Sequence, residues 1–251
     1  EAYSQGVTNP STEWTIMFQA GCTTMAAWAN AANCAMLAEA FRIHGDEGLC
    51  SYYTEEAAKA YRYAEKQEWT QLDDLQNIGT SGMRGRDFKQ MAAAFLYNLT
   101  GERSWEDVMA QESVVKDGKS PVFSKQGRNQ FYQIWGTAAY LTCPHERHYP
   151  ELYSNMKSSV NHQADENNVN HMYARPSRRT ANDPRWQTSQ NLQMVMLAHY
   201  IADNSERRSR LEAAMYIEAG WGLGRNPANI VEMTGLGERH IVDCYTTGRN
   251  D

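Results

Sequence analysis

Apolar side chains recur at helical spacing along most of the chain, and the clearest case lies between residues 88 and 99. Positions i, i+3, i+4, i+7, i+8 and i+11 of this stretch are Phe88, Met91, Ala92, Phe95, Leu96 and Leu99. This spacing places all of them on one face of an α-helix. Thr100-Gly101 follows directly, and glycine commonly ends a helix because it takes the left-handed conformation without steric cost. The pattern therefore predicts a helix over this stretch.

Similar patterns predict further helices along the chain. They run approximately from Ala20 to Ile43, Thr54 to Trp69, Ser104 onward for a short segment, Asn129 to Leu141, Pro150 to Ala164, Trp186 to Ala202 and Ser205 to Trp221. Alternation at strand spacing is not found over a useful length, so we expect successive helices joined by loops. The longest linker is a polar stretch from Asp165 to Pro184. No Pro/Ser-rich linker divides the chain, and we expect residues 1–251 to be part of a single domain.

Composition favours the same fold class. Alanine and methionine are common, with 12 Met, whereas valine and isoleucine are sparse. Alanine and methionine favour helices and β-branched residues favour strands, so the composition predicts an all-α protein. Hydrophobic residues make up 41% of the chain and aromatic residues 11%, which is enough to bury a sizeable core.

Charge and hydropathy exclude some classes of partner. The formal net charge is −6 and the pI about 5.7, which argues against nucleic acid, because a phosphate backbone calls for a basic face. No stretch approaches the roughly 18 consecutive apolar residues of a membrane span, so we expect no membrane partner. The chain opens with Glu1-Ala-Tyr-Ser4 rather than Met, and we expect a mature or internal piece. Its five scattered cysteines include no Cys-x-x-Cys and are interpreted as small buried apolar residues.

Several motifs in order point to one family. Gly222-Leu-Gly-Arg-Asn-Pro-Ala-Asn229 is followed by Thr234-Gly-Leu-Gly237, and both come after a predicted helix. Upstream lie an Ala-rich first helix, the run from Gly85 to Gly101 with its Asp-x-x-x-x-Ala-Ala-x-x-Leu-Tyr-x-x-Thr-Gly pattern, and Arg185-Trp-Gln-Thr-Ser-Gln-Asn191. Together these motifs resemble the middle and late part of the catalytic domain of glycoside hydrolase family 9, which contains endoglucanases and other cellulases. The resemblance implies an (α/α)6 toroid of helical hairpins, incomplete in this chain.

The resemblance also implies an activity, namely inverting hydrolysis of β-linked glucan or a related polysaccharide or oligosaccharide. Inversion needs a protonated acid at the leaving oxygen and a carboxylate that holds a water on the opposite face, about 6.5–9.5 Å away. In relatives the base Asp lies upstream of the matched stretch and the acid Glu beyond it. We therefore expect both outside the 251 residues, and the catalytic residues in this chain are unknown. Asp73-Asp74 and Asp165-Glu166 are interpreted as solvated charges.

Sugar-binding clefts use aromatic faces, because the C–H side of a pyranose stacks on a ring while its rim takes hydrogen bonds. We therefore expect substrate-binding residues at helix starts and in the matched motifs. These candidates are Trp186, Arg185, Tyr132, Trp135, His240 and Arg249. Arg249 stands about two residues from the place of a sugar-contacting Arg in relatives. Trp28, inside the Ala-rich helix, is instead expected in the core.

Alternatives remain open at this point. A carbohydrate-binding remnant without catalysis would keep the cleft aromatics, and another helical-toroid sugar enzyme, an epimerase or polysaccharide lyase, would use the basic cluster around Arg178. Cys143, His145 and His148 have crude metal spacing without an evident fourth ligand, so no metal site is assigned. The resemblance allows for bound calcium and implies a secreted or periplasmic protein.

Overall fold

The computed structural model describes residues 23–67, 83–124, 131–173 and 188–240, with the backbone alone between 188 and 191. Helices account for most of these residues, as composition predicted. The elements are α1 (Thr24–His44), α2 (Glu47–Glu65), α4 (Gly85–Thr100), α5 (Arg103–Glu112), β1 (Phe123–Ser124), β2 (Phe131–Tyr132), α6 (Ile134–Leu141), α7 (Pro150–Ala164), the π-helical turn η3 (Asp165–Val169), α8 (Thr188–Tyr200) and α9 (Ser205–Gly222). None of the described helices is both long and apolar enough to cross a membrane.

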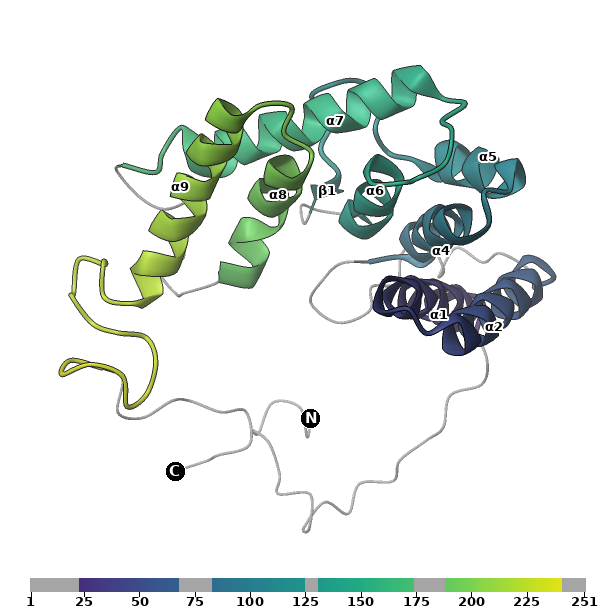
Figure 1. Cartoon of the computed structure of the whole chain (residues 1–251), viewed down its shortest axis with the longest axis horizontal. Helices are drawn as coiled ribbons and strands as arrows, with labels where there is room; N and C mark the ends of the chain where they lie inside the picture. The colour runs from purple at the N-terminus through teal and green to yellow at the C-terminus, as the bar shows by residue number, and fades with distance from the viewer. Residues whose placement is uncertain (1–22, 68–82, 125–130, 174–187, 241–251) are drawn as a thin grey trace, which may run out of the picture.

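The helices form an arc of hairpins (Figure 1). Among the described elements, successive helices pair as α1 with α2, α4 with α5, α6 with α7, and α8 with α9. The first member of each pair lies on the concave side of the arc and the second on the convex side. Contacts between α1 and α4, α4 and α6, and α6 and α8 join the pairs. The predicted toroid of helical hairpins is confirmed as an open arc over the described residues.

Small residues let the first hairpin pack closely. Thr23 Oγ1 accepts a hydrogen bond from the N–H of Ala26 and begins α1, and Gly45 ends it with a φ of 89°. Between these ends the buried face of α1 carries mainly alanines, which are Ala27, Ala31, Ala32, Ala35 and Ala38. Without long side chains on this face, α1 can approach α2 on one side and α4 on the other. Trp28 is 2% exposed, which confirms its predicted place in the core.

Contacts between the concave helices show that they share one direction. Lys89 Nζ, in the second turn of α4, lies 5.5 Å from the ring centroid of Trp28, in the second turn of α1. At the other end of α4, Asn98 Nδ2 donates to the main-chain oxygen of Ala139, late in α6 (3.0 Å). The start of α4 therefore lies beside the start of α1, and the end of α4 lies beside the end of α6. The N-terminal ends of α1, α4 and α6 therefore lie on the same face of the arc.

The predicted helices are found, with corrections at their starts. The second helix begins at Glu47, not near Thr54, because Asp46 Oδ1 accepts from the N–H of Leu49 (2.9 Å) and caps it. The helix predicted from Asn129 is wrong at its start. Residues 131–132 instead pair antiparallel with 123–124, and α6 begins only at Ile134. Strands this short show no alternation that sequence analysis could detect.

Gly136 sets the distance between α4 and α6. A Cβ placed on Gly136 would lie 1.9 Å from Gln90 Oε1 and 2.6 Å from its Cδ. Gln90 is fully buried, and neither of its side-chain polar atoms has a hydrogen-bond partner among the described residues. The side chain therefore fills the space over the glycine rather than serving a polar network. Any larger residue at position 136 would have to displace it.

We predict that Gly136→Ala destabilises the protein by about 1–3 kcal/mol, because it overpacks a closed helix interface. Gly48→Ala is the matched control. A Cβ there meets only Asp46 Oδ1 at 3.6 Å, and alanine in a helix is favoured over glycine by about 0.5–1 kcal/mol. Urea unfolding of the two variants should therefore move in opposite directions from the wild type. Equal midpoints would contradict the packing argument.

Candidate functional site

The candidate site lies at the N-terminal ends of the concave helices, where the segment 131–135 leads into α6. Tyr132 extends this arrangement to α8, because its hydroxyl donates to Gln193 Oε1 in the second turn of that helix. The starts of α4, α6 and α8 are thus held around one short segment. Both Tyr132 and Trp135, which the sequence proposed as substrate-binding residues, belong to it.

The buried carboxylate of Asp87 holds this segment in place. Asp87 is the third residue of α4 and is 1% exposed. Its Oδ2 accepts from the N–H of Arg84 (3.0 Å), which closes a capping box, and from the N–H of Tyr132 (2.9 Å). One oxygen therefore ties the first turn of α4 to β2. Sequence analysis quoted Asp87 only as part of a family motif, although an acidic residue at the start of an apolar helix is a recognisable capping signal.

Burial raises the pKa of Asp87 to about 6. Hydrogen bonds from Tyr132, Arg84 and the Gln133 side chain favour the charged form and oppose this rise, as does the charge of Arg84. Desolvation is the larger effect because the carboxyl group is removed from water. The site therefore contains a carboxyl group that changes protonation in a mildly acidic range.

The two predicted aromatic residues occupy different environments. Tyr132 is 7% exposed, and its ring lies 5.6 Å from that of Phe123 in β1. Trp135, in the first turn of α6, is 40% exposed. Tyr132 thus acts as a tie between elements, whereas the ring of Trp135 has a surface that a sugar could contact. Neither role in binding is tested by this geometry, and both stay predictions.

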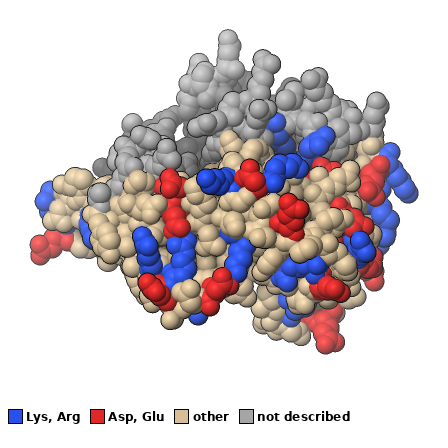
Figure 2. Space-filling model, turned by 90° about the horizontal axis from the view of Figure 1, so that it is seen from above, with Lys and Arg blue, Asp and Glu red and all other residues tan. Residues whose placement is uncertain are grey.

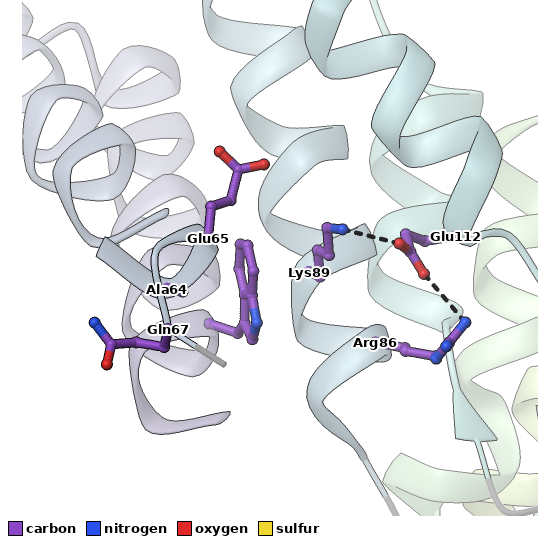
Figure 3. A pocket seen from close by; sticks show the side chains of 7 residues that line it. Ala64, Glu65, Gln67, Arg86, Lys89 and Glu112 are labelled. Atoms are coloured by element: carbon purple, nitrogen blue, oxygen red, sulfur yellow. Dashed lines mark hydrogen bonds and ion pairs between the residues drawn. The ribbon is translucent and has the colours of Figure 1, made fainter. Parts of the chain in front are cut away.

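A pocket of about 310 Å³ opens at the same end, between the first two hairpins. Residues from the end of α2, the start of α4 and the end of α5 line it. Glu112 accepts from Lys89 (2.9 Å) and lies 3.7 Å from Arg86, as Figure 3 shows. Trp28 also lines the pocket, and its indole N–H has no partner among the described residues. Sequence analysis missed this pocket because its residues come from distant segments.

The C-terminal motif organises its own turn. Asn226 Nδ2 donates to the main-chain oxygens of Trp221 (2.9 Å) and Ile230 (2.7 Å), and its Oδ1 accepts from the N–H of Ile230 (3.2 Å). His240 is half-buried, and its Nδ1 lies 2.8 Å from the main-chain oxygen of Gly237. A sugar-contacting role for His240 remains a prediction. Three other predicted site residues, Arg185, Trp186 and Arg249, lie outside the described residues.

Cys143, His145 and His148 lie at the opposite end of the concave helices and have other partners. His145 Nε2 is 3.1 Å from the main-chain oxygen of Asn98. His148 Nδ1 is 2.6 Å from Oε2 of the fully buried Glu106, and burial raises the pKa of the Cys143 thiol, which disfavours the thiolate that metals bind. Across the described ranges no group of three or more His, Cys, Asp or Glu side chains could hold a metal ion. The calcium that the family resemblance allows is not tested by these contacts.

Within the part of the chain that the structure describes, the other charges and thiols discussed above form no second site. Asp165 pairs with Arg207 (2.5 Å), so it belongs to an ion pair between η3 and α9. Among the described cysteines, Cys34, Cys50 and Cys143 form no disulfide; Cys143 is buried as expected, whereas Cys34 and Cys50 are only partly buried. Figure 2 shows Lys/Arg and Asp/Glu side chains interspersed over the described part of one face. That view contains no continuous basic strip of the kind that follows a phosphate backbone.

Comparisons with known proteins agree with this architecture. The model of glycosyl hydrolase family 9 matches residues 7–250. No curated protein matches the chain significantly. A metagenome-derived glycoside hydrolase family 9 endoglucanase has a similar structure, with a TM-score of 0.67 and 19% identity over 94% of this chain and 43% of its own.

Two further solved structures are similar. A family 9 protein from Bacteroides ovatus has a TM-score of 0.66 and 20% identity over 94% of this chain and 45% of its own. A single mutant of a thermostable endoglucanase from Alicyclobacillus acidocaldarius has a TM-score of 0.61 and 19% identity, over 88% of this chain and 41% of its own. The chain thus spans less than half the length of each of these structures.

We predict that Asp87 makes stability depend on pH. Its pKa is about 6 in the folded protein, above the ordinary value of 3.8 for an aspartate, so the folded state binds this proton more tightly. The cost of the buried charge is therefore present above about pH 6 and is relieved as the pH falls toward 4. Relative to Asp87→Asn, the wild type should gain about 2 kcal/mol between about pH 8 and pH 4. Parallel stability curves for the two proteins, measured by urea unfolding, would contradict this.

We also predict that His148→Ala destabilises the protein by roughly 1–3 kcal/mol, because buried Glu106 loses one of its hydrogen-bond partners. Tyr140 Oη (2.7 Å) and the N–H of residue 148 (2.8 Å) would remain. His44→Ala, at the exposed end of α1, should change stability much less. Thermal unfolding with and without zinc completes the test. A zinc-dependent rise in the melting temperature of the wild type, lost in His148→Ala, would favour a metal site instead.

Proposed function

The chain belongs to glycosyl hydrolase family 9, and from this premise we propose that the protein hydrolyses β-linked glucan or a related glycan with inversion at the anomeric carbon. The observation that carries the proposal is the family match over residues 7–250, together with an arc of helical hairpins like that of solved family members. Two of those solved structures are named endoglucanases, which supports a polysaccharide as the substrate class.

The described residues contribute a scaffold, an exposed aromatic ring at the start of α6 and a charged pocket, and we infer that the ring and the pocket belong to one end of a binding cleft. The exposed ring of Trp135 offers an apolar face for the C–H side of a pyranose. The pocket around Glu112 adds charged groups that could hydrogen-bond the hydroxyl groups at the rim of a sugar. Inversion also needs two carboxylates with a water between one of them and the sugar. The motifs that supply this base and acid in relatives have no match in the 251 residues, so we assign neither role to a residue here.

The test begins with the authentic gene product and soluble β-glucan. Release of reducing ends, with an α-anomeric product seen first by NMR, would support hydrolysis by inversion. Binding without release would favour a carbohydrate-binding remnant. An ultraviolet-absorbing product from a uronic-acid polymer would favour a lyase, for which the cluster of Arg175, Arg178, Arg179 and Arg185, outside the described residues, was considered.

We predict that Trp135→Ala weakens binding of a β-1,4-gluco-oligosaccharide about tenfold, which corresponds to about 1.4 kcal/mol of lost stacking. Tyr200→Ala is the matched control. Tyr200 is 72% exposed and lies at the opposite, C-terminal end of a concave helix, so its removal should leave binding unchanged. Isothermal titration calorimetry measures both affinities. An equal loss in the two variants would mean that the sugar does not bind at the α6 start.

A further inference from the structure

The segment 131–135 is fixed from several sides although it contains only two strand residues. Its N–H at Tyr132 donates to Asp87 on α4. Gln133 Nε2 donates to the main-chain oxygen of Glu112 at the end of α5 (2.9 Å), and Gln133 Oε1 accepts from the N–H of Val114 (2.9 Å). The Tyr132 hydroxyl reaches α8. Every one of these contacts lies within three residues of Trp135.

We propose that Asp87 is a positioning residue for glycan binding, which holds the segment 131–135 so that Trp135 presents its ring at the cleft end of α6. The proposal rests on the proposed function for its ligand, a β-linked gluco-oligosaccharide. Asp87 does not reach the sugar itself, because it is 1% exposed and lies beneath the main chain of Tyr132. Asp87 acts through the main chain of the segment 131–135. It therefore affects where the Trp135 ring lies and how well ordered that ring is.

A carboxylate holds this segment better than a neutral group does. Hydrogen bonds to an ionised acceptor are roughly twice as strong as those between neutral groups. When Asp87 takes up a proton, the molecule as a whole is relieved of a buried charge, but the N–H of Tyr132 is held less firmly. Global stability and local order at the cleft therefore change in opposite directions as the pH falls through about 6.

The charged groups around Asp87 do not prevent this change. Arg84 precedes it on α4, and its positive charge favours the carboxylate. From α5, Glu112 faces the site through its main-chain contact with Gln133, and its carboxylate is paired with Lys89. From β2, the facing group is the N–H of Tyr132. Burial outweighs the charge of Arg84, so the pKa of Asp87 stays raised.

The experiment compares the wild type, Asp87→Asn and Glu106→Gln at pH values on either side of about 6. Glu106 is the matched control, since it is an equally buried carboxylate at the opposite end of the concave helices. Two quantities are measured: the affinity for a β-1,4-gluco-oligosaccharide, and the protection of the Tyr132 amide from hydrogen exchange relative to the intrinsic rate at each pH. Asparagine keeps a side-chain acceptor, so Asp87→Asn preserves the cap while removing the titration.

The proposal expects wild-type affinity to fall about tenfold below pH 6, with a parallel loss of Tyr132 protection. Asp87→Asn should bind at the weaker level throughout, and Glu106→Gln should keep the wild-type profile despite lower stability. An unchanged pH profile in Asp87→Asn would overturn the proposal. If Asp87→Asn does not fold, the wild type alone still tests the proposal. Protection of its Tyr132 amide from hydrogen exchange that stays constant across pH 6 would overturn the proposal equally well.

The failure of the proposed function looks different. A wild type that binds no gluco-oligosaccharide at any pH would refute glucan recognition and, with it, the role of Asp87 in that recognition. Tyr132 protection that still falls with pH in the wild type and not in Asp87→Asn would then show that the tie exists and serves another ligand. The two measurements therefore separate an error about the substrate from an error about Asp87.

Discussion

Close packing of parallel helices on the concave side of the arc is the constraint on which the other features depend. Alanines on α1 and Gly136 on α6 leave no room for larger residues, and Gln90 occupies the space above the glycine. With these distances fixed, the starts of the helices must lie at one end and their ends at the other. A series of hairpins joined in this way brings loops that are far apart in sequence to a shared face, where a site can form.

Buried carboxylates stabilise each end of this packing by different means. At the N-terminal ends of the concave helices, Asp87 accepts main-chain hydrogen bonds from two segments, and the charge of Arg84 also favours its ionised form. At the opposite end, Glu106 accepts hydrogen bonds from the Tyr140 hydroxyl and from the main-chain N–H of His148, and its Oε2 is also hydrogen-bonded to Nδ1 of that residue. Burial and this carboxylate raise the pKa of Tyr140, which keeps its hydroxyl a donor. The first arrangement leaves a carboxyl group whose pKa is raised to about 6 by burial, whereas the second joins α5 to the loop before α7.

The motif that identifies the family has a structural function in this chain. Asn226 closes the turn after α9 through three hydrogen bonds to the main chain, and Gly224, Gly235 and Gly237 have positive φ values of 102°, 76° and 76°. Glycine accommodates such values because it lacks a Cβ. The turn therefore needs these residues whatever reaction the protein performs. This explains why the motif indicates ancestry and fold firmly and indicates the chemistry only indirectly.

The sequence by itself determined the all-α class, the approximate positions of the helices and the family. These depend on local periodicity, on capping residues such as Gly101, and on turn residues such as Asn226, which are all encoded within a few neighbouring positions. The start of α6 and the antiparallel pair of β1 and β2 were decided only by tertiary structure, because Asp87, 45 positions before Tyr132, takes the N–H that a longer helix would have used. Tertiary structure also separated Tyr132 from Trp135, burying one and exposing the other, and assembled the pocket around Glu112. Burial and contact between distant segments are properties of the packed fold, so no local pattern could have predicted them.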